Sequence, residues 1–135
     1  MSGVSIKTRS KVAKRAAFRC EYCRLHEEDG FLAFEIDHII SKKHGGGNEI
    51  GNLAFACPQC NAHKGSDIAT TGDSYLEIIT LFHPRLQNWD EHFSIVDGRI
   101  EPKTKTGKAT IKILHFNSPD RVYQRTLLFD AKRWP

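Results

Sequence analysis

Residues 57–65 of the chain read CPQCNAHKG, and this stretch decides how the rest is interpreted. Cys57 and Cys60 stand three positions apart, and a matching pair, Cys20 and Cys23, lies nearer the N-terminus. Four thiolates complete the tetrahedral shell that zinc prefers, and a closed site of this kind is structural. A redox pair would need a βαβ setting, which the sequence does not show. Because the chain has no other cysteine, two such pairs predict one structural Zn²⁺ site rather than four inert core cysteines.

The 33 residues between the two cysteine pairs exceed the usual zinc-ribbon gap of roughly 15–20, so a folded insert is expected there. Residues 31–40 (FLAFEIDHII) are rich in aromatic and β-branched residues and predict a strand. Residues 41–48 (SKKHGGGN) contain three consecutive glycines and predict a loop. We expect residues 50–56 to begin a helical segment. A further helix over 58–64 would begin at a proline and stop at a glycine.

The remaining elements are predicted from capping and turn signals. Ser74 and Glu77 match a capping box, which predicts a helix running to about His83. Asp97-Gly98 can supply a tight turn, so a hairpin is expected over 93–101. The outer segments are a basic helix over 7–18, a stretch over 107–116 that is open between helix and strand, and a helix from Ser118-Pro119-Asp120 to about Lys132.

The net charge of +4 is distributed unevenly along the chain. Residues 1–24 carry +6 and residues 99–135 carry +6, whereas residues 25–73 carry −5 and residues 74–98 carry −3. An acidic centre between basic ends suits a metal site flanked by surfaces that hold phosphates, although solvated surface lysines give the same pattern.

Length and composition favour one compact domain of 135 residues, with 39% hydrophobic and 27% charged residues. The helices and strands expected along the chain make its fold class α+β. We expect residues 1–70 to form the core with its basic helix, and residues 71–135 to be a C-terminal α/β extension packed on it. No apolar run reaches 18 residues and no secretory signal precedes the core, so a cytoplasmic protein without membrane contact is expected. In that reducing compartment disulfides are not expected.

Asp37, His38, Asn52 and Asn61 are the side chains in or beside the insert that suit phosphodiester hydrolysis. This reaction needs a divalent cation to neutralise phosphoryl charge, and oxygen ligands such as those of Asp37 and Asn61 suit Mg²⁺. It also needs a base for water, and neutral histidine suits that role. Adjacent strand residues point to opposite faces, so the strand must bend or end at Asp37-His38 if both are to share one site.

These residues resemble the HNH (ββα-metal, or His-Me finger) endonucleases, and most closely their zinc-containing four-cysteine branch. The resemblance covers residues 20–65, about a third of the chain. The matching motifs are Cys20-x2-Cys23, Asp37-His38-Ile39-Ile40, Gly45-Gly46, Asn52-Leu53 and Cys57-x2-Cys60-Asn61-x2-Lys64-Gly65. It implies a ββα-metal core with a four-cysteine zinc site and metal-dependent cleavage of DNA.

The resemblance also implies a role for each matching position. Asp37 and Asn61 would bind the catalytic Mg²⁺ or Mn²⁺, His38 would be the general base, and Asn52 would brace the loop and orient His38. Many members have histidine where this chain has Asn61. His63 is two residues further on, but positions 61 and 63 of a helix point about 200° apart, so we expect Asn61 to be the ligand.

Contacts to nucleic acid are expected from Lys42, Lys43, His44, His63 and Lys64, which lie in or beside the motifs. An HNH site typically handles one strand, so the protein is expected to act as a monomer or a homodimer. The alternative function is a non-catalytic zinc-ribbon module that binds nucleic acid through the same knuckles and basic ends. The Asp-His pair distinguishes the two, because a pure binding module does not need it.

Overall fold

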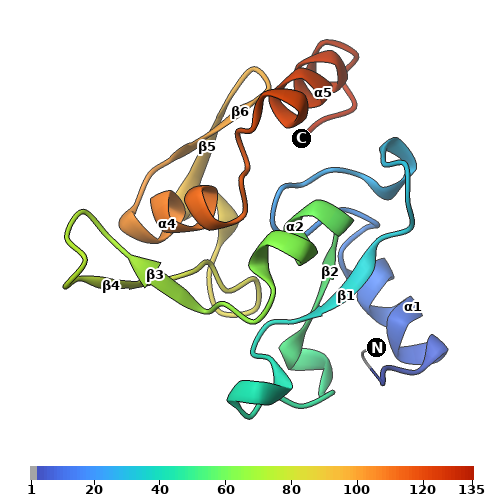
Figure 1. Ribbon diagram of the computed structural model, residues 1–135. Coiled ribbons are helices and arrows are strands. Elements are labelled where there is room, and N and C mark those ends of the chain that lie inside the picture. Colours follow the sequence, from blue (N-terminus) through green and yellow to red (C-terminus); the bar gives the residue numbers. More distant parts are fainter. Residues whose placement is uncertain (1–2) are drawn as a thin grey trace. The chain divides into compact units, whose positions relative to one another are not determined.

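The computed structural model describes residues 3–135 (Figure 1). The chain divides into two compact units, with the boundary between Ser66 and Asp67. The expected packing of the C-terminal part on the core stays a prediction. No helix in the described part is both long and apolar enough to cross a lipid bilayer.

The first unit contains an antiparallel hairpin followed by a helix, which is the ββα arrangement (Figure 1). Strand β1 pairs with strand β2 in a register that places Asp37 opposite Ala54 and His38 opposite Leu53. The elements are α1 (Ile6–Arg15), the 3₁₀ turns η1 (Glu27–Asp29), η2 (Lys42–His44) and η3 (Ile50–Asn52), the strands β1 (Glu35–His38) and β2 (Leu53–Ala56), and α2 (Pro58–Lys64).

The helical segment predicted for residues 50–56 is wrong beyond its first turn. Only η3 is helical, and all four residues of β2 are buried in the strand that pairs with β1. Periodicity cannot separate a short buried apolar run from a helix, and here the neighbouring strand decides. The predicted strand over 31–40 is shorter than expected, because β1 pairs over only the four residues that β2 offers, and Phe31 before it is 99% exposed.

Helix α1 forms as predicted at its N-terminus and ends three residues early. Ser5 caps it by accepting a hydrogen bond from the backbone N–H of Thr8, and Val12 and Ala13 bury its inner face. Ala17 and Phe18 adopt positive φ angles of 54° and 61°, which an α-helix does not allow. The chain therefore turns toward the first cysteine pair instead of continuing the helix.

Helix α2 confirms the prediction for residues 58–64. Pro58 occupies the first turn, where its missing N–H costs nothing, and Cys57 is the N-cap. Gly65 ends the helix with a φ of 52°, a conformation that favours glycine. This helix brings the second cysteine pair and Asn61 next to the hairpin.

The second unit contains two further hairpins and three helices. Its core includes Phe82, Phe93 and Phe116, whose rings pack with centroid separations of 5.5 and 5.6 Å around Phe93. The elements are β3 (Ala69–Thr71), β4 (Ile78–Thr80), α3 (Trp89–His92), β5 (Phe93–Val96), β6 (Arg99–Pro102), α4 (Lys105–Ile113) and α5 (Pro119–Asp130).

The helix predicted from Ser74 to His83 is wrong, because this stretch forms the turn and second strand of the β3–β4 hairpin. The Ser74 hydroxyl accepts from the backbone N–H of Leu76, not Glu77. β-branched residues favour strands, and Ile78, Ile79 and Thr80 lie directly after the apparent capping box.

The other predictions for this unit are confirmed. The β5–β6 hairpin turns at Asp97, which takes the positive φ of 54°. The stretch over 107–116 resolves mainly as helix α4, and α5 begins at Pro119 and ends at Asp130, two residues before the expected end. Two buried arginines, Arg121 and Arg125, donate from α5 to backbone carbonyls of the same unit.

Candidate metal centres and active site

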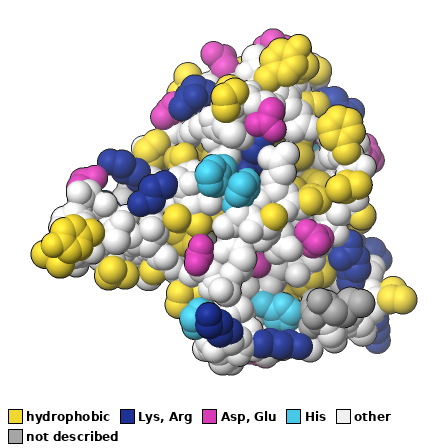
Figure 2. All heavy atoms as spheres, in the orientation of Figure 1, with side chains coloured by type: hydrophobic (Ala, Val, Ile, Leu, Met, Phe, Trp, Pro, Cys, Tyr) yellow, Lys and Arg dark blue, Asp and Glu magenta, His cyan; other side chains and the backbone are white. Residues whose placement is uncertain are grey.

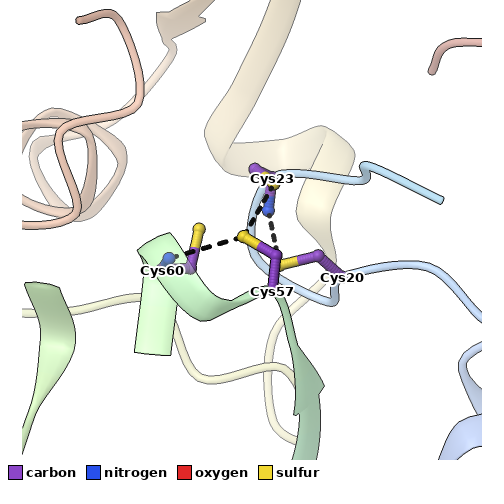
Figure 3. A group of neighbouring side chains, drawn as sticks. All are labelled: Cys20, Cys23, Cys57 and Cys60. Carbon is purple, nitrogen blue, oxygen red and sulfur yellow. Dashed lines mark hydrogen bonds between the residues drawn. The ribbon is translucent and has the colours of Figure 1, made fainter. Parts of the chain in front are cut away.

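The four cysteines come together in the first unit, and their sulfur atoms all lie within 4.8 Å of one another. Figure 3 shows Cys20 and Cys23 approaching from one loop, and Cys57 and Cys60 from the start of α2. All four side chains are buried and none forms a disulfide. The two knuckles predicted from the sequence therefore form one cluster.

Local backbone geometry shapes each knuckle. The backbone N–H of Cys23 donates to Cys20 Sγ, and that of Cys60 donates to Cys57 Sγ, both at 3.4 Å. Arg24 closes the first knuckle with a φ of 71°, and its backbone N–H donates to the Cys20 carbonyl. Each turn thus points two sulfurs the same way.

The cluster fits a zinc ion. Zinc–sulfur bonds of about 2.3 Å in a tetrahedron require sulfur–sulfur separations of about 3.8 Å, and Cys23 Sγ lies 3.8 Å from Cys57 Sγ. Without a cation, burial raises the pKa of the Cys20 and Cys60 thiols well above the ordinary range. A divalent cation reverses this preference because it binds thiolates. By its donor set and burial, the cluster is therefore suited to hold a structural zinc ion.

A second site lies where β1 ends. Asp37, His38 and Asn61, the three residues expected around a catalytic metal, line one pocket of about 570 Å³. β1 ends at His38, so the two adjacent side chains can both reach this space. The full lining is Arg9, Glu35, Ile36, Asp37, His38, Ser41, Asn61, Gly65 and Ser66.

The carboxylate of Asp37 is buried, with 3% of the residue exposed, and it is held from two sides. The Tyr22 hydroxyl donates to Oδ2 at 2.6 Å, and Lys64 Nζ lies 3.2 Å from the same oxygen. Burial raises the pKa of Asp37, while the Lys64 ammonium and the Tyr22 hydroxyl oppose that rise. A carboxylate offers about four lone-pair sites, so these contacts leave acceptor capacity for a cation.

Lys64 corrects one expectation. It was expected at the nucleic-acid surface, but only 2% of it is exposed. Its ammonium pairs with Asp37 and also donates to the carbonyls of His38 and Ile39, at 3.3 and 3.0 Å. A buried cation needs such partners, so Lys64 joins the end of α2 to the end of β1. Sequence alone does not reveal this burial, because lysine is usually exposed.

His38 is half-buried and is oriented by a residue that the sequence did not single out. Its Nε2 lies 2.7 Å from Asn48 Oδ1. An amide oxygen only accepts hydrogen bonds, so Nε2 carries the proton of the neutral ring and Nδ1 keeps a lone pair. Asn48 follows the three glycines of the loop, and no motif marks it.

Asn52 lies under the loop that follows β1 and is 8% exposed. Its Oδ1 accepts from the Ile40 N–H, and its Nδ2 donates to the carbonyls of Ile40 and Gly47, all at 2.9 Å. Gly46 makes room for this amide, because an added Cβ would lie 1.7 Å from the Ile40 carbonyl oxygen. Asn52 does not line the pocket, so it can act on His38 only through the loop.

Two further pocket residues were not predicted. Glu35 accepts a hydrogen bond from Asn61 Nδ2 at 3.1 Å, and Arg9 of α1 reaches the pocket while donating to the Phe34 carbonyl. The spacing of Glu35 and Asp37 on one strand is the signal that could have identified the first, since residues two apart share a face. No comparable signal exists for Arg9.

The remaining expected contacts lie outside the pocket. Lys42, Lys43 and His44 are exposed on η2, and His63 is exposed on α2. In Figure 2 basic and histidine side chains gather at the lower edge of the view, over the η2 segment. These side chains do not line the pocket, but they can reach a ligand that extends beyond it.

A ββα hairpin-and-helix, clamped by a four-cysteine cluster and carrying an Asp-His pair, defines a class of metal-dependent nuclease folds. Residues 20–67 match the family described as HNH endonuclease. This match includes both knuckles, the hairpin and α2. This part of the chain is therefore an HNH endonuclease domain with the ββα-metal fold, and nuclease-type chemistry is the function that such a domain implies.

The chain is also similar to the Septu protein PtuB of Bacillus thuringiensis, with 32% identity over 115 residues. The aligned part is 82% of this chain and 41% of that protein. The chain thus spans less than half the length of this curated relative, so the similarity reaches only part of that longer protein.

Proposed function

We propose that the HNH domain is a metal-dependent DNA endonuclease that hydrolyses phosphodiester bonds. The observation that supports this most is the shared pocket of Asp37, His38 and Asn61, beside a buried four-cysteine cluster. These side chains supply a carboxylate, an imidazole and an amide, which are the groups that the reaction requires.

Asp37 and Asn61 would hold a divalent cation, Mg²⁺ or Mn²⁺. Their oxygens belong to the hard ligand class that these ions prefer, and the open pocket leaves space for water and a phosphate. A bound cation of this kind neutralises phosphoryl charge and stabilises the leaving oxygen. Tyr22 and Lys64 keep the Asp37 carboxylate fixed at the end of β1.

His38 would act as the general base through Nδ1. Asn48 holds the proton on Nε2, so the lone pair of the ring stays on the other nitrogen and can take a proton from water. Asn52 would support this arrangement indirectly by bracing the loop that carries Asn48.

Arg9 is proposed to contact a phosphate of the substrate. Arg9 lines the pocket, and its guanidinium has five N–H donors, of which the Phe34 carbonyl occupies one. Lys42, Lys43, His44 and His63 would contact the DNA backbone further out. Because such contacts release counterions, DNA binding should weaken with salt.

The test is nicking of supercoiled plasmid by the purified full chain with Mg²⁺ or Mn²⁺, and its loss on chelation of the divalent cation. His38→Ala should lower the rate by at least about 10²-fold, which is typical of a general base. His115→Asn, an exposed position with a φ of 52° that asparagine tolerates, is the matched control and should cleave normally.

The same assay separates the proposal from the alternative. A non-catalytic zinc module would bind DNA in a salt-sensitive way and leave plasmid intact under every divalent cation tested. Full cleavage by His38→Ala would refute the assigned base while leaving the HNH domain in place.

A further inference from the structure

Glu35 and Asn61 form a contact whose purpose the fold does not explain. The Asn61 Nδ2 donates to Glu35 Oε2 at 3.1 Å, at the edge of the pocket. Glu35 is exposed, and within residues 3–135 its carboxylate forms no ion pair. Because Glu35 is exposed and Asn61 only half-buried, a hydrogen bond between their side chains contributes little to the free energy of unfolding.

The hydrogen bond to Glu35 can select one of the two orientations of the Asn61 amide. The two ends of an asparagine side chain have nearly the same shape, but only Oδ1 can bind a cation, and Nδ2 with its two protons repels one. An unrestrained amide would present either end to the pocket. A carboxylate can only accept hydrogen bonds when ionised, so Glu35 binds Nδ2 and not Oδ1.

Strand geometry places Glu35 where it can do this. Glu35 and Asp37 are two residues apart on β1 and share a face, and Asn61 meets that face from α2. All three line the pocket. The Asn61 amide is therefore held at its nitrogen end by a carboxylate, while the residue lines the space in which the cation would be held.

We propose that Glu35 is a positioning residue that holds the Asn61 amide with Oδ1 toward the divalent cation. This inference rests on the proposed function, in which Asp37 and Asn61 bind that cation. It assigns to Glu35 no direct contact with the metal or the substrate.

The experiment measures Mn²⁺ affinity of the zinc-loaded full chain by electron paramagnetic resonance, without substrate. Without Glu35 the Asn61 amide can populate several rotamers and both orientations, and only a fraction of the molecules then has Oδ1 placed to bind the ion. Because the apparent affinity falls in proportion to that fraction, Glu35→Ala should weaken Mn²⁺ binding by about 3- to 10-fold. The melting temperature should not change. Glu49→Ala removes an exposed carboxylate of the same unit that does not line the pocket, and should leave affinity unchanged.

A double-mutant cycle tests positioning against direct ligation. In Asn61→His the imidazole has no equivalent amide end to misplace, so adding Glu35→Ala to it should change Mn²⁺ affinity by less than about 2-fold. Glu35→Gln, which keeps an acceptor oxygen but adds a donor, should lie between wild type and Glu35→Ala. If Glu35→Ala weakens binding equally with Asn or His at position 61, Glu35 acts on the ion itself and the proposal is overturned.

A separate variant distinguishes this proposal from the proposed function. If Asp37→Asn leaves Mn²⁺ affinity unchanged, the metal site of the proposed function fails and the role of Glu35 fails with it. If Asp37→Asn weakens binding strongly while Glu35→Ala has no effect, only the positioning role is refuted.

Discussion

Tyr22 stands between the two cysteines of the first knuckle, and its hydroxyl donates to Asp37 Oδ2 at 2.6 Å. One residue thus joins the zinc cluster to the carboxylate at the end of β1. Both side chains are buried, so neither can turn to solvent for another partner. Burial and the neighbouring carboxylate raise the pKa of Tyr22 well above its ordinary value, which keeps the hydroxyl protonated as a donor.

Tyr22→Phe should lower the free energy of unfolding by about 1–3 kcal/mol, because it removes the hydroxyl donor from a buried carboxylate oxygen and leaves that oxygen with the Lys64 ammonium as its partner. Zinc content should stay at one ion per chain, since the cysteines are untouched. Chemical denaturation and metal analysis check both points. Tyr123→Phe, at a position 68% exposed, is the control and should be neutral. An unchanged free energy for Tyr22→Phe would show that the contact is not formed in solution.

Removal of zinc should unfold the first unit and leave the second unit folded. Both tryptophans, Trp89 and Trp134, lie in the second unit, which has no cysteine, so their fluorescence reports on that unit alone. Cys57→Ser or a strong chelator should abolish amide-exchange protection in β1 and β2, because metal binding of roughly 10–16 kcal/mol is folding free energy in such sites. An unchanged melting curve and protection pattern for Cys57→Ser would contradict the structural role.

Lys64→Met should destabilise the protein by about 3–5 kcal/mol, because it leaves the buried Asp37 carboxylate without its counter-ion. The double variant Asp37→Asn/Lys64→Met should recover much of that loss, because neither of these two positions then carries a buried charge. Denaturant unfolding of wild type, Lys64→Met, Asp37→Asn and the double variant gives the coupling energy directly. A Lys64→Met loss below about 1 kcal/mol would mean that water reaches the pair.

Gly46→Ala should lower the free energy of unfolding by about 1–3 kcal/mol, as overpacking does. Its Cβ would lie 1.7 Å from the Ile40 carbonyl oxygen and 2.7 Å from Asn52 Nδ2, and the first of these atoms is backbone. Gly47→Ala is the matched control, because the three atoms nearest its added Cβ all belong to the Glu49 carboxylate, which can move away. Equal effects of the two substitutions would argue against the close fit at Gly46.

The sequence predicted the elements that local chemistry determines. Pro58 and Gly65 mark the two ends of α2, and Ser118-Pro119 marks the start of α5, because proline and glycine restrict the backbone wherever they occur. The spacing of the cysteines was enough to predict their cluster, because two pairs of thiolates together complete the tetrahedral shell that zinc prefers.

Secondary-structure elements whose conformation depends on residues far away in the sequence could not be predicted in the same way. Residues 53–56 form a strand because β1 is beside them, and residues 78–80 form one because β3 is. Around the pocket, Tyr22 and Lys64 owe their positions to burial and to partners 15 and 27 residues away. Such contacts leave no periodic trace in the sequence.

The buried ammonium of Lys64 has a consequence for how a divalent ion would reside beside Asp37. The Lys64 ammonium lies 3.2 Å from a carboxylate oxygen of Asp37 and neutralises much of its negative charge, so the buried carboxylate does not need a metal ion to remain in place. The same charge repels an incoming dication, which lowers the gain on entry. We therefore expect a divalent ion that binds weakly beside Asp37 and exchanges rapidly, so that its occupancy follows its free concentration. The zinc expected among the four sulfurs would instead be held tightly.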